Sequence, residues 1–245
     1  VLSFLLPAEK FIITDDGTYG YDVAKHFKIS DDKILFLKNG IDKISKDNKG
    51  TYRKLIIRKY NLPSNSFIVV SVSRLVSWKR VDRIINAFNT IKDTNVFLIV
   101  IGDGEERKFY ESIKKNNNIL FLGAIKNSEV QKFMLGCDCF VSTYDISNLG
   151  NPLLEAMAAG KPIITLNNGN TKSVFNGKNM ILLPYDNENK IIKLIKENVL
   201  FLKNNKVFSE KLSQESRKYA DENLMSWDER INFEINQILL LCGEK

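Results

Sequence analysis

The stretch FIVVSVSRLVSWKR (67–80) decides the fold class, because it joins an apolar run to a polar turn and the start of a helix. Its first part, FIVVSVS (67–73), is apolar at most positions, which is typical of a parallel strand covered on both faces. Val81, Ile84 and Phe88 then follow at helical spacing. The stretch therefore predicts a buried strand followed by an amphipathic helix.

The same alternation extends over much of the chain. The predicted strands are FIIT (11–14), KILFL (33–37), FIVVSVS (67–73), VFLIVIG (96–102), NILFLG (118–123), CFVST (139–143), PIITL (162–166) and MILLP (180–184). Because strands and helices alternate as βαβαβ from Phe67 to Pro184, we expect an α/β fold with a Rossmann-like, doubly wound parallel sheet. C-terminal helices follow, predicted over 188–202, over 211–222 and after Ser226.

Composition indicates a globular protein without a membrane span. The 245 residues are 44% apolar, enough for a sizeable core, and no run of about 18 apolar residues occurs. The net charge is +7, but the basic residues are scattered and the aromatic residues fall mostly at core spacing. We therefore expect a solvated basic surface and no nucleic-acid partner.

The cysteines and the histidine predict no metal site. Cys137, Cys139 and Cys242 are an odd set without paired spacing, which favours a reducing, cytoplasmic compartment. Cys137 and Cys139 would point the same way on one strand, but a zinc site needs two further ligands. His26 stands alone, so we expect a structural role for it. The start VLSFLLPAEKF (1–11) lacks the features of a signal peptide and has no Met, so we expect a fragment or a trimmed chain.

A first candidate site is the turn SRLVSWKR (73–80) at the end of a predicted strand, where doubly wound sheets bind ligands. Arg74 and Lys79 could clamp a diphosphate there, since arginine offers a planar fork and lysine a point charge. A solvated basic turn is the alternative. Nearby, Gly102-Asp103-Gly104 lacks the third glycine of the dinucleotide fingerprint, which favours a tight turn over ligand contact.

A second candidate site is NLGNPLLEAMAAGKP (148–162), which follows an apolar run. Asn151 suits a helix N-cap and Pro152 the first helical position, while Gly160 with Pro162 predicts the end of the helix. The free N–H groups of such a helix start can bind an anion. Glu155 lies one turn inside an apolar helix, so we expect it to be partly buried and to need a partner.

Taken in order, the motifs resemble the donor-binding half of retaining glycosyltransferases of family 4, which have the GT-B fold. SVSRLVSWKR (71–80) resembles the GRL…KG segment of the family, with Ser73 in place of glycine. The other matching motifs are NGID (39–42), which alone is a simple turn signal, IGDGEER (101–107), FLGAI (121–125) and NPLLEAMAAGKPII (151–164).

The resemblance implies three parts. Residues 1–42 would be the end of an N-terminal acceptor domain and its linker, and residues 43–222 the nucleotide-sugar donor-binding domain. Residues 223–245 would form a C-terminal helix that crosses back toward the N-terminal domain, because SWDERINFEINQILLL (226–241) resembles that helix. Within this scheme the polar segment KISKDNKG (43–50) is predicted to be a linker.

The resemblance also implies roles for individual residues. Arg74 and Lys79 would neutralise the donor diphosphate and Glu155 would bind the ribose hydroxyls, so these three are the predicted catalytic residues. N–H groups around Gly150 to Leu153 would face the phosphate or the transferred sugar. The predicted donor-binding residues are Gly123, Ala124, Ile125 and Lys126, near the base, and Ser147, Asn148, Leu149, Gly150, Asn151, Pro152 and Leu153.

Two departures from the family pattern bear on chemistry. The family has two glutamates eight positions apart, and the first, which usually contacts the donor sugar, falls at Ser147. Asp145 lies two positions earlier and could substitute if the backbone stays extended. Lys172 stands where a glutamate is usual.

We therefore expect a retaining, metal-independent glycosyltransferase without a cofactor, whose donor is a UDP or GDP sugar. Its acceptor would be a glycan, a lipid-linked sugar or a small molecule. Its own N-terminal domain would be a partner, and a membrane surface is a further candidate partner. Its location would be cytoplasmic or peripheral at the membrane. This chain alone should be inactive without its N-terminal half. The alternatives are a non-catalytic nucleotide-sugar binding module and a nucleotide-sugar epimerase on the same fold.

Overall fold

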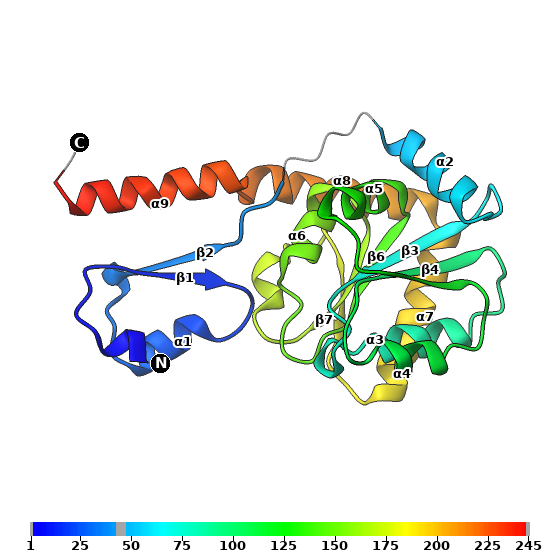
Figure 1. Cartoon of the computed structure of the whole chain (residues 1–245), viewed down its shortest axis with the longest axis horizontal. Helices are drawn as coiled ribbons and strands as arrows, with labels where there is room; N and C mark the ends of the chain where they lie inside the picture. Colours follow the sequence, from blue (N-terminus) through cyan, green and yellow to red (C-terminus); the bar gives the residue numbers. More distant parts are fainter. Residues whose placement is uncertain (1, 43–47, 244–245) are drawn as a thin grey trace.

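A computed structural model describes residues 2–42 and 48–243 of the chain (Figure 1). It has a large α/β part and a smaller part made of the N-terminal segment and the last helix. The large part contains a six-stranded parallel sheet in the order β5-β4-β3-β6-β7-β8. Its strands are β3 (Phe67–Val72), β4 (Val96–Ile101), β5 (Ile119–Gly123), β6 (Cys139–Ser142), β7 (Ile163–Asn167) and β8 (Ile181–Pro184).

The sheet confirms the predicted Rossmann-like, doubly wound fold. From β3 the chain builds outward through β4 to β5, then returns to the other side of β3 and continues through β6 and β7 to β8. All neighbouring strands are parallel, so their carboxyl ends meet at one edge. The order reverses between β3 and β6, and the loops after these two strands flank the crevice where such sheets bind ligands.

Helices cover both faces of the sheet. On one face, α2 (Lys49–Lys59), α5 (Asn127–Gly136) and α6 (Asn151–Ala158) contribute to one apolar core. On the other face, α3 (Val81–Asn89), α4 (Arg107–Ser112) and α7 (Glu188–Asn204) contribute to the second. The long α8 (Lys206–Asn223) takes part in both, through Ala220 and Leu212. The strands are therefore buried on both sides, as their continuous apolar character predicts.

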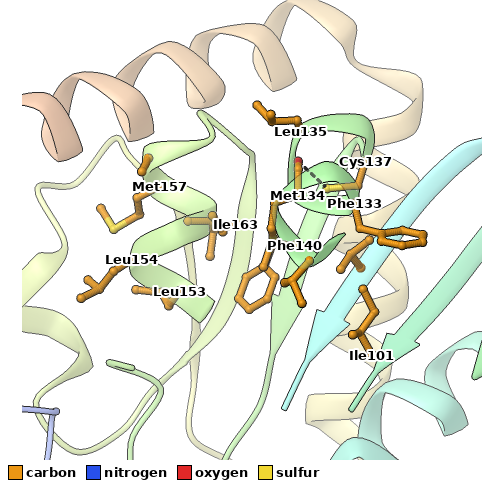
Figure 2. Close-up of a cluster of buried hydrophobic side chains, with 14 of the residues drawn as sticks. Ile101, Phe133, Met134, Leu135, Cys137, Phe140, Leu153, Leu154, Met157 and Ile163 are labelled. Carbon is orange, nitrogen blue, oxygen red and sulfur yellow. Dashed lines mark hydrogen bonds between the residues drawn. The ribbon is translucent and has the colours of Figure 1, made fainter. Parts of the chain in front are cut away.

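The first core positions α6, which carries one of the predicted sites. Leu153, Leu154 and Met157 of α6 lie in one cluster with Phe140 of β6 and Ile163 of β7 (Figure 2). Burial of each of these side chains stabilises the fold by about 1.5–3 kcal/mol. The cluster holds the first turn of α6 at the carboxyl edge of the sheet. Gly160, with φ +59°, ends the helix as predicted.

The smaller part joins the N-terminal segment to the last helix. It contains β1 (Phe11–Asp15), α1 (Gly20–His26) and β2 (Ile34–Lys38), with β1 and β2 paired in parallel, and α9 (Trp227–Leu241). Ile41 forms a β-bridge with Ser226, and Arg230 Nε donates to the carbonyl of Lys38 at 3.0 Å. In Figure 1 α9 extends away from the large part on the side of β1 and β2. Short 3-10 turns complete the structure: η1 (Leu2–Leu5), η2 (Asp31–Lys33), η3 (Ser77–Lys79) and η4 (Thr171–Val174).

Two sequence expectations need correction. The predicted linker 43–50 falls partly on residues 43–47, outside the described residues, and its end belongs to α2, which packs through the buried Ile56. Cys137 does not share a strand with Cys139, because it ends α5 before β6 begins; both thiols are buried.

Candidate functional site

Lys79 lies between the loops after β3 and β6, where the strand order reverses. It ends η3, in the loop after β3, and its Nζ lies 3.7 Å from the ring centroid of Tyr144, in the loop after β6. The ring of Trp78 lies 4.0 Å from the same nitrogen. Cation–π contacts of this kind stabilise an ammonium group and restrict its position. The contact with Tyr144 thus joins the two loops that flank the crevice.

The surroundings of Lys79 also change its pKa. Burial of the ammonium group lowers the pKa of Lys79 to about 8, and the negative charge of Asp16, from the loop after β1, opposes this shift. A charged lysine that has lost hydration gains more than a fully solvated one from an anionic ligand, because its field is less screened. The position therefore suits a phosphate group.

The other basic residues of this loop differ in their availability. The Arg74 side chain is exposed and makes no hydrogen bond or ion pair within the described residues. Arg80 adopts a left-handed conformation, φ +47°, and its guanidinium pairs with Asp82 at 3.0 Å and with Glu188 at 2.9 Å. Lys79 and Arg74 thus remain the candidates for a ligand, whereas Arg80 is committed to structural ion pairs.

Asp145 is not placed to replace the acid that is absent at Ser147. Its carboxylate pairs with Arg83 at 2.7 Å and with Arg80 at 3.3 Å, and Arg83 itself is almost fully buried. The backbone at Asp145 lies beyond the end of β6, so the extended geometry that the substitution required is absent. The idea that Asp145 substitutes is therefore wrong for this structure.

The start of α6 differs by one residue from the prediction. Gly150, not Asn151, is the N-cap residue, and Pro152 lies in the first turn. The Asn151 side chain accepts a hydrogen bond from Asn39 Nδ2 at 2.7 Å, so it ties the NGID segment to α6 instead of capping the helix.

The amides at this helix start are fewer than the sequence predicts. The N–H of Gly150 donates to the Asn148 carbonyl and that of Leu153 to the Gly150 carbonyl, both at 3.0 Å, and Pro152 has no N–H. Of the four residues from Gly150 to Leu153, Asn151 alone keeps an N–H without an acceptor in the described part of the chain.

Glu155 carries a strongly perturbed carboxyl group. Burial, with a smaller contribution from the negative charge of Asp42, raises the pKa of Glu155 to about 7. The Asp42 carboxylate is held by Asn127 and Gln131 of α5, at 2.9 and 2.8 Å. Glu155 makes no side-chain hydrogen bond or ion pair within residues 2–42 and 48–243. A half-buried carboxyl group without a partner has the capacity to bind hydroxyl groups of a ligand.

Ser147 lies under the loop that joins β1 to α1. The Ser147 side chain is buried, and its Oγ accepts a hydrogen bond from the N–H of Leu149 at 3.1 Å. A Cβ atom added to Gly17 would lie 1.8 Å from this Oγ, so the two residues are in direct contact. No local pattern indicates this contact of the N-terminal segment, although DDGTYG (15–20) has the composition of a turn.

Several predicted donor-binding residues serve the loop itself. The Asn148 side chain is fully buried, accepts from the Tyr144 N–H at 2.9 Å and donates to Asn168 at 2.8 Å. The side chains of Leu149 and Leu153 are also buried. Because their side chains are buried, these three residues can meet a ligand only through their backbone.

The segment predicted to lie near the base follows β5. Gly123 has φ +71°, and its carbonyl accepts from the N–H of Gly102 at 2.9 Å. Ala124 and Lys126 are exposed and Ile125 is half-buried, so their backbone is available at the same edge as Lys79. Packing requires glycine at position 102, because a Cβ there would lie 1.9 Å from the Ser73 carbonyl oxygen. The glycine turn is thus a packing turn, the reading that the sequence favoured.

A hollow of about 560 Å³ lies elsewhere on the described surface. It is lined by Leu135, Gly160 and residues of α8. Because α6 begins at the candidate site and ends near Gly160, this hollow is at the opposite end of the helix. Among the described residues no group of His, Cys, Asp and Glu is arranged to hold a metal ion, and no helix has the length and apolar character to cross a membrane.

Several known proteins that are similar to this chain are glycosyltransferases. Poly(glycerol-phosphate) alpha-glucosyltransferase of Bacillus subtilis is 29% identical over 193 residues, which cover 73% of this chain and 27% of that protein. A capsular polysaccharide biosynthesis glycosyltransferase of Staphylococcus aureus is 28% identical over 204 residues, covering 78% and 51%. The chain spans only 36% to 41% of three uncharacterised glycosyltransferases of Methanocaldococcus jannaschii.

Solved structures show the same fold at low identity. A glycosyltransferase from Rickettsia africae superposes with a TM-score of 0.78 at 19% identity, over 95% of this chain and 64% of that one. Anabaena HepE in complex with UDP-glucose superposes with a TM-score of 0.76 at 19% identity, again over 95% and 64%. The family profile described as glycosyl transferases group 1 matches residues 52–220. This chain therefore belongs to the glycosyl transferases group 1 family.

Proposed function

We propose that this chain is the donor-binding half of a retaining glycosyltransferase of family 4. It would take a sugar from a nucleotide-diphosphate donor of the UDP or GDP type and transfer it to a glycan, a lipid-linked sugar or a small molecule. The observation that carries the proposal is the position of Lys79. A partly desolvated cation lies between the loops after β3 and β6, at the reversal of strand order.

Each proposed role follows from the local chemistry. Lys79 and the exposed Arg74 would bind the diphosphate and stabilise the charge that grows on it as the bond to the sugar breaks. The Asn151 amide at the start of α6 would add a hydrogen bond to the same group. With two side-chain cations in these positions, the leaving group has a source of positive charge within the protein, which supports a mechanism that needs no metal.

Glu155 would bind the ribose hydroxyls of the donor. Its carboxyl group is half-buried, has no partner in the described structure and has a pKa of about 7. Hydroxyl groups that donate to it would favour the ionised form and so relieve part of the cost of burial. The backbone of Gly123 to Lys126, at the same edge of the sheet, would meet the base.

We further propose that residues 1–42 and α9 belong with an N-terminal half that carries the acceptor site. Ile231, Ile235 and Ile238 lie at helical spacing on α9 and are 46% to 53% exposed. A covering domain would bury this apolar stripe. Turnover would then require both halves, and the chain alone would bind nucleotide without transferring sugar.

Calorimetric titration of this chain with UDP, GDP, ADP and their sugar conjugates tests the proposal. Arg74→Ala and Lys79→Ala should each weaken binding of the preferred diphosphate by about 1.5–3 kcal/mol. Lys178→Ala is the matched control, because Lys178 is an exposed lysine that precedes β8, at the opposite edge of the sheet. Unchanged affinity in both site variants would contradict the assignment.

A second candidate is a non-catalytic nucleotide-sugar binding module. Ser147 stands where the family has an acid, and Asp145 is held by two arginines, which favours lost chemistry. Turnover by the whole protein distinguishes the two, compared with its Ser147→Glu variant. Turnover of donor without an acceptor would instead indicate an epimerase.

A further inference from the structure

Two glycines allow the loop between β1 and α1 to pack closely against the candidate site. Gly17 has φ +80°, and its carbonyl accepts a hydrogen bond from the N–H of Asn170 at 2.7 Å. Gly169 has φ +50°, and a Cβ there would lie 2.6 Å from the Gly17 carbonyl oxygen. On its other side Gly17 covers the buried hydroxyl of Ser147. Backbone contacts this close leave no room for side chains, so the loop has a defined position beside the site.

Asp16 directly precedes Gly17, and one of its carboxylate oxygens is available to bind a ligand. Its Oδ1 accepts from the N–H and the hydroxyl of Thr18, at 3.0 and 2.6 Å. Its Oδ2 has no hydrogen bond or ion pair within the part of the chain that the structure describes. The neighbouring Asp15 differs, because it is buried and bound to Asn170 and Lys38, at 3.2 and 3.8 Å. Asp16 is therefore the acid of this loop that can still bind a ligand.

The contact of Gly17 with Ser147 brings its neighbour Asp16 to the loop after β6, the same loop whose Tyr144 contacts Lys79. The charge of Asp16 acts on Lys79 strongly enough to offset part of the fall in the pKa of Lys79 that burial causes. A ligand bound to Lys79 therefore lies within reach of the negative charge of Asp16. A diphosphate on Lys79 would be repelled by Asp16 unless the ligand also offers hydrogen-bond donors to the carboxylate. In a nucleotide sugar those donors are the hydroxyl groups of the sugar, next to the diphosphate.

We propose that Asp16 is a specificity-determining residue of the donor site, whose carboxylate accepts hydrogen bonds from hydroxyl groups of the transferred sugar while Lys79 binds the diphosphate. The proposal rests on the proposed function. It assigns to the N-terminal segment an acidic group that the loop after β6 does not provide, since Ser147 is buried there and its hydroxyl is engaged with Leu149.

The test compares each sugar conjugate with its own diphosphate. Calorimetry measures the affinity of this chain and of Asp16→Asn for UDP and UDP-glucose, GDP and GDP-mannose, and ADP and ADP-glucose. Asparagine keeps an oxygen for Thr18, so the loop is preserved while the charge is lost. For the pair that the unmodified chain binds, we expect the affinity ratio of conjugate to diphosphate to fall roughly 10- to 100-fold. Affinity for the diphosphate alone should stay the same or rise.

Two further variants sharpen the result. Asp22→Asn removes an exposed acid of α1 in the same segment and should leave the ratio unchanged. Gly17→Ala should displace the loop, because its Cβ meets Ser147, and should lower the ratio although Asp16 is retained. Thermal unfolding of each variant verifies that it is folded.

Three outcomes would overturn the inference. An unchanged ratio in Asp16→Asn would show that the carboxylate does not touch the sugar. A loss of diphosphate affinity that appears only with Mg²⁺ would show that Asp16 holds a metal ion instead. Binding of no diphosphate by the unmodified chain would refute the proposed function itself, an outcome distinct from an unchanged ratio.

Discussion

Replacing Glu155 with glutamine should stabilise the protein at pH 8 and have little effect at pH 5. Burial raises the pKa of Glu155 from 4.5 to about 7, with a smaller contribution from Asp42. Below pH 4.5 the carboxyl group is neutral in both the folded and the unfolded chain. Between pH 4.5 and 7 the folded chain keeps a proton that the unfolded chain has lost, so stability falls as pH rises. Above pH 7 the whole penalty is present.

The size of the penalty follows from the pKa difference. A change from 4.5 to about 7 corresponds to at most about 3.4 kcal/mol, at 1.36 kcal/mol for each pKa unit. The side chain is only half-buried, and residual contact with water reduces the value. We therefore expect Glu155→Gln to raise the free energy of unfolding by about 2 kcal/mol more at pH 8 than at pH 5.

Urea unfolding of the unmodified chain and of Glu155→Gln at pH 5 and pH 8 measures this difference directly. Other groups that titrate in this range affect both proteins alike, so they cancel. Glu105→Gln serves as the control, because Glu105 is exposed and has no hydrogen bond or ion pair in the described structure. If Glu155→Gln changed stability equally at the two pH values, the raised pKa and the burial argument behind it would be refuted.

Three other predictions concern separate parts of the structure. Gly102→Ala should lower the free energy of unfolding by about 3 kcal/mol or more, because its Cβ would lie 1.9 Å from the Ser73 carbonyl oxygen; Gly177→Ala, with φ +85° but open space around it, should cost only about 1 kcal/mol. Urea midpoints distinguish them, and equal losses would show that the contact is unimportant. Arg83→Met should cost about 3 kcal/mol in the same assay, since two carboxylates lose a buried partner, and an unchanged midpoint would contradict this. Because the pKa of Lys79 is about 8, the unmodified chain should lose affinity for the diphosphate between pH 7 and pH 9 as this lysine loses its charge. In Lys79→Met this loss should be absent. If calorimetry gave parallel pH profiles for the two proteins, Lys79 would not be the residue that binds the diphosphate.

The sequence predicted the sheet well because its strands are apolar on both faces. A continuous apolar run such as FIVVSV (67–72), with helical patterns on both sides of it in the sequence, is typical of a buried parallel strand. The helices that failed or shifted are those whose stability depends on partners. α2 begins in a polar segment and is held by Ile56 in the core, a contact that local pattern cannot reveal.

The candidate site was predictable only in part. Lys79, Arg74 and Glu155 stand out by their positions after a strand and inside a short apolar helix. The ring of Tyr144 beside Lys79 comes from a loop far along the chain, and the pairing of Asp145 with Arg83 depends on how α3 lies against β6. Such contacts join residues 60 or more positions apart, and no local spacing encodes them.

The local sequence alone predicted the α/β class and the location of the candidate site at the carboxyl edge of the sheet. It also identified the residues that belong to the glycosyl transferases group 1 pattern. These predictions were possible because strand burial and turn chemistry are local properties. The environment of those residues was not local. Packing determined that Lys79 is desolvated, that Glu155 lacks a partner and that Gly17 lies on Ser147. A pKa and a contact depend on every group within several ångströms, and only the folded chain brings those groups together.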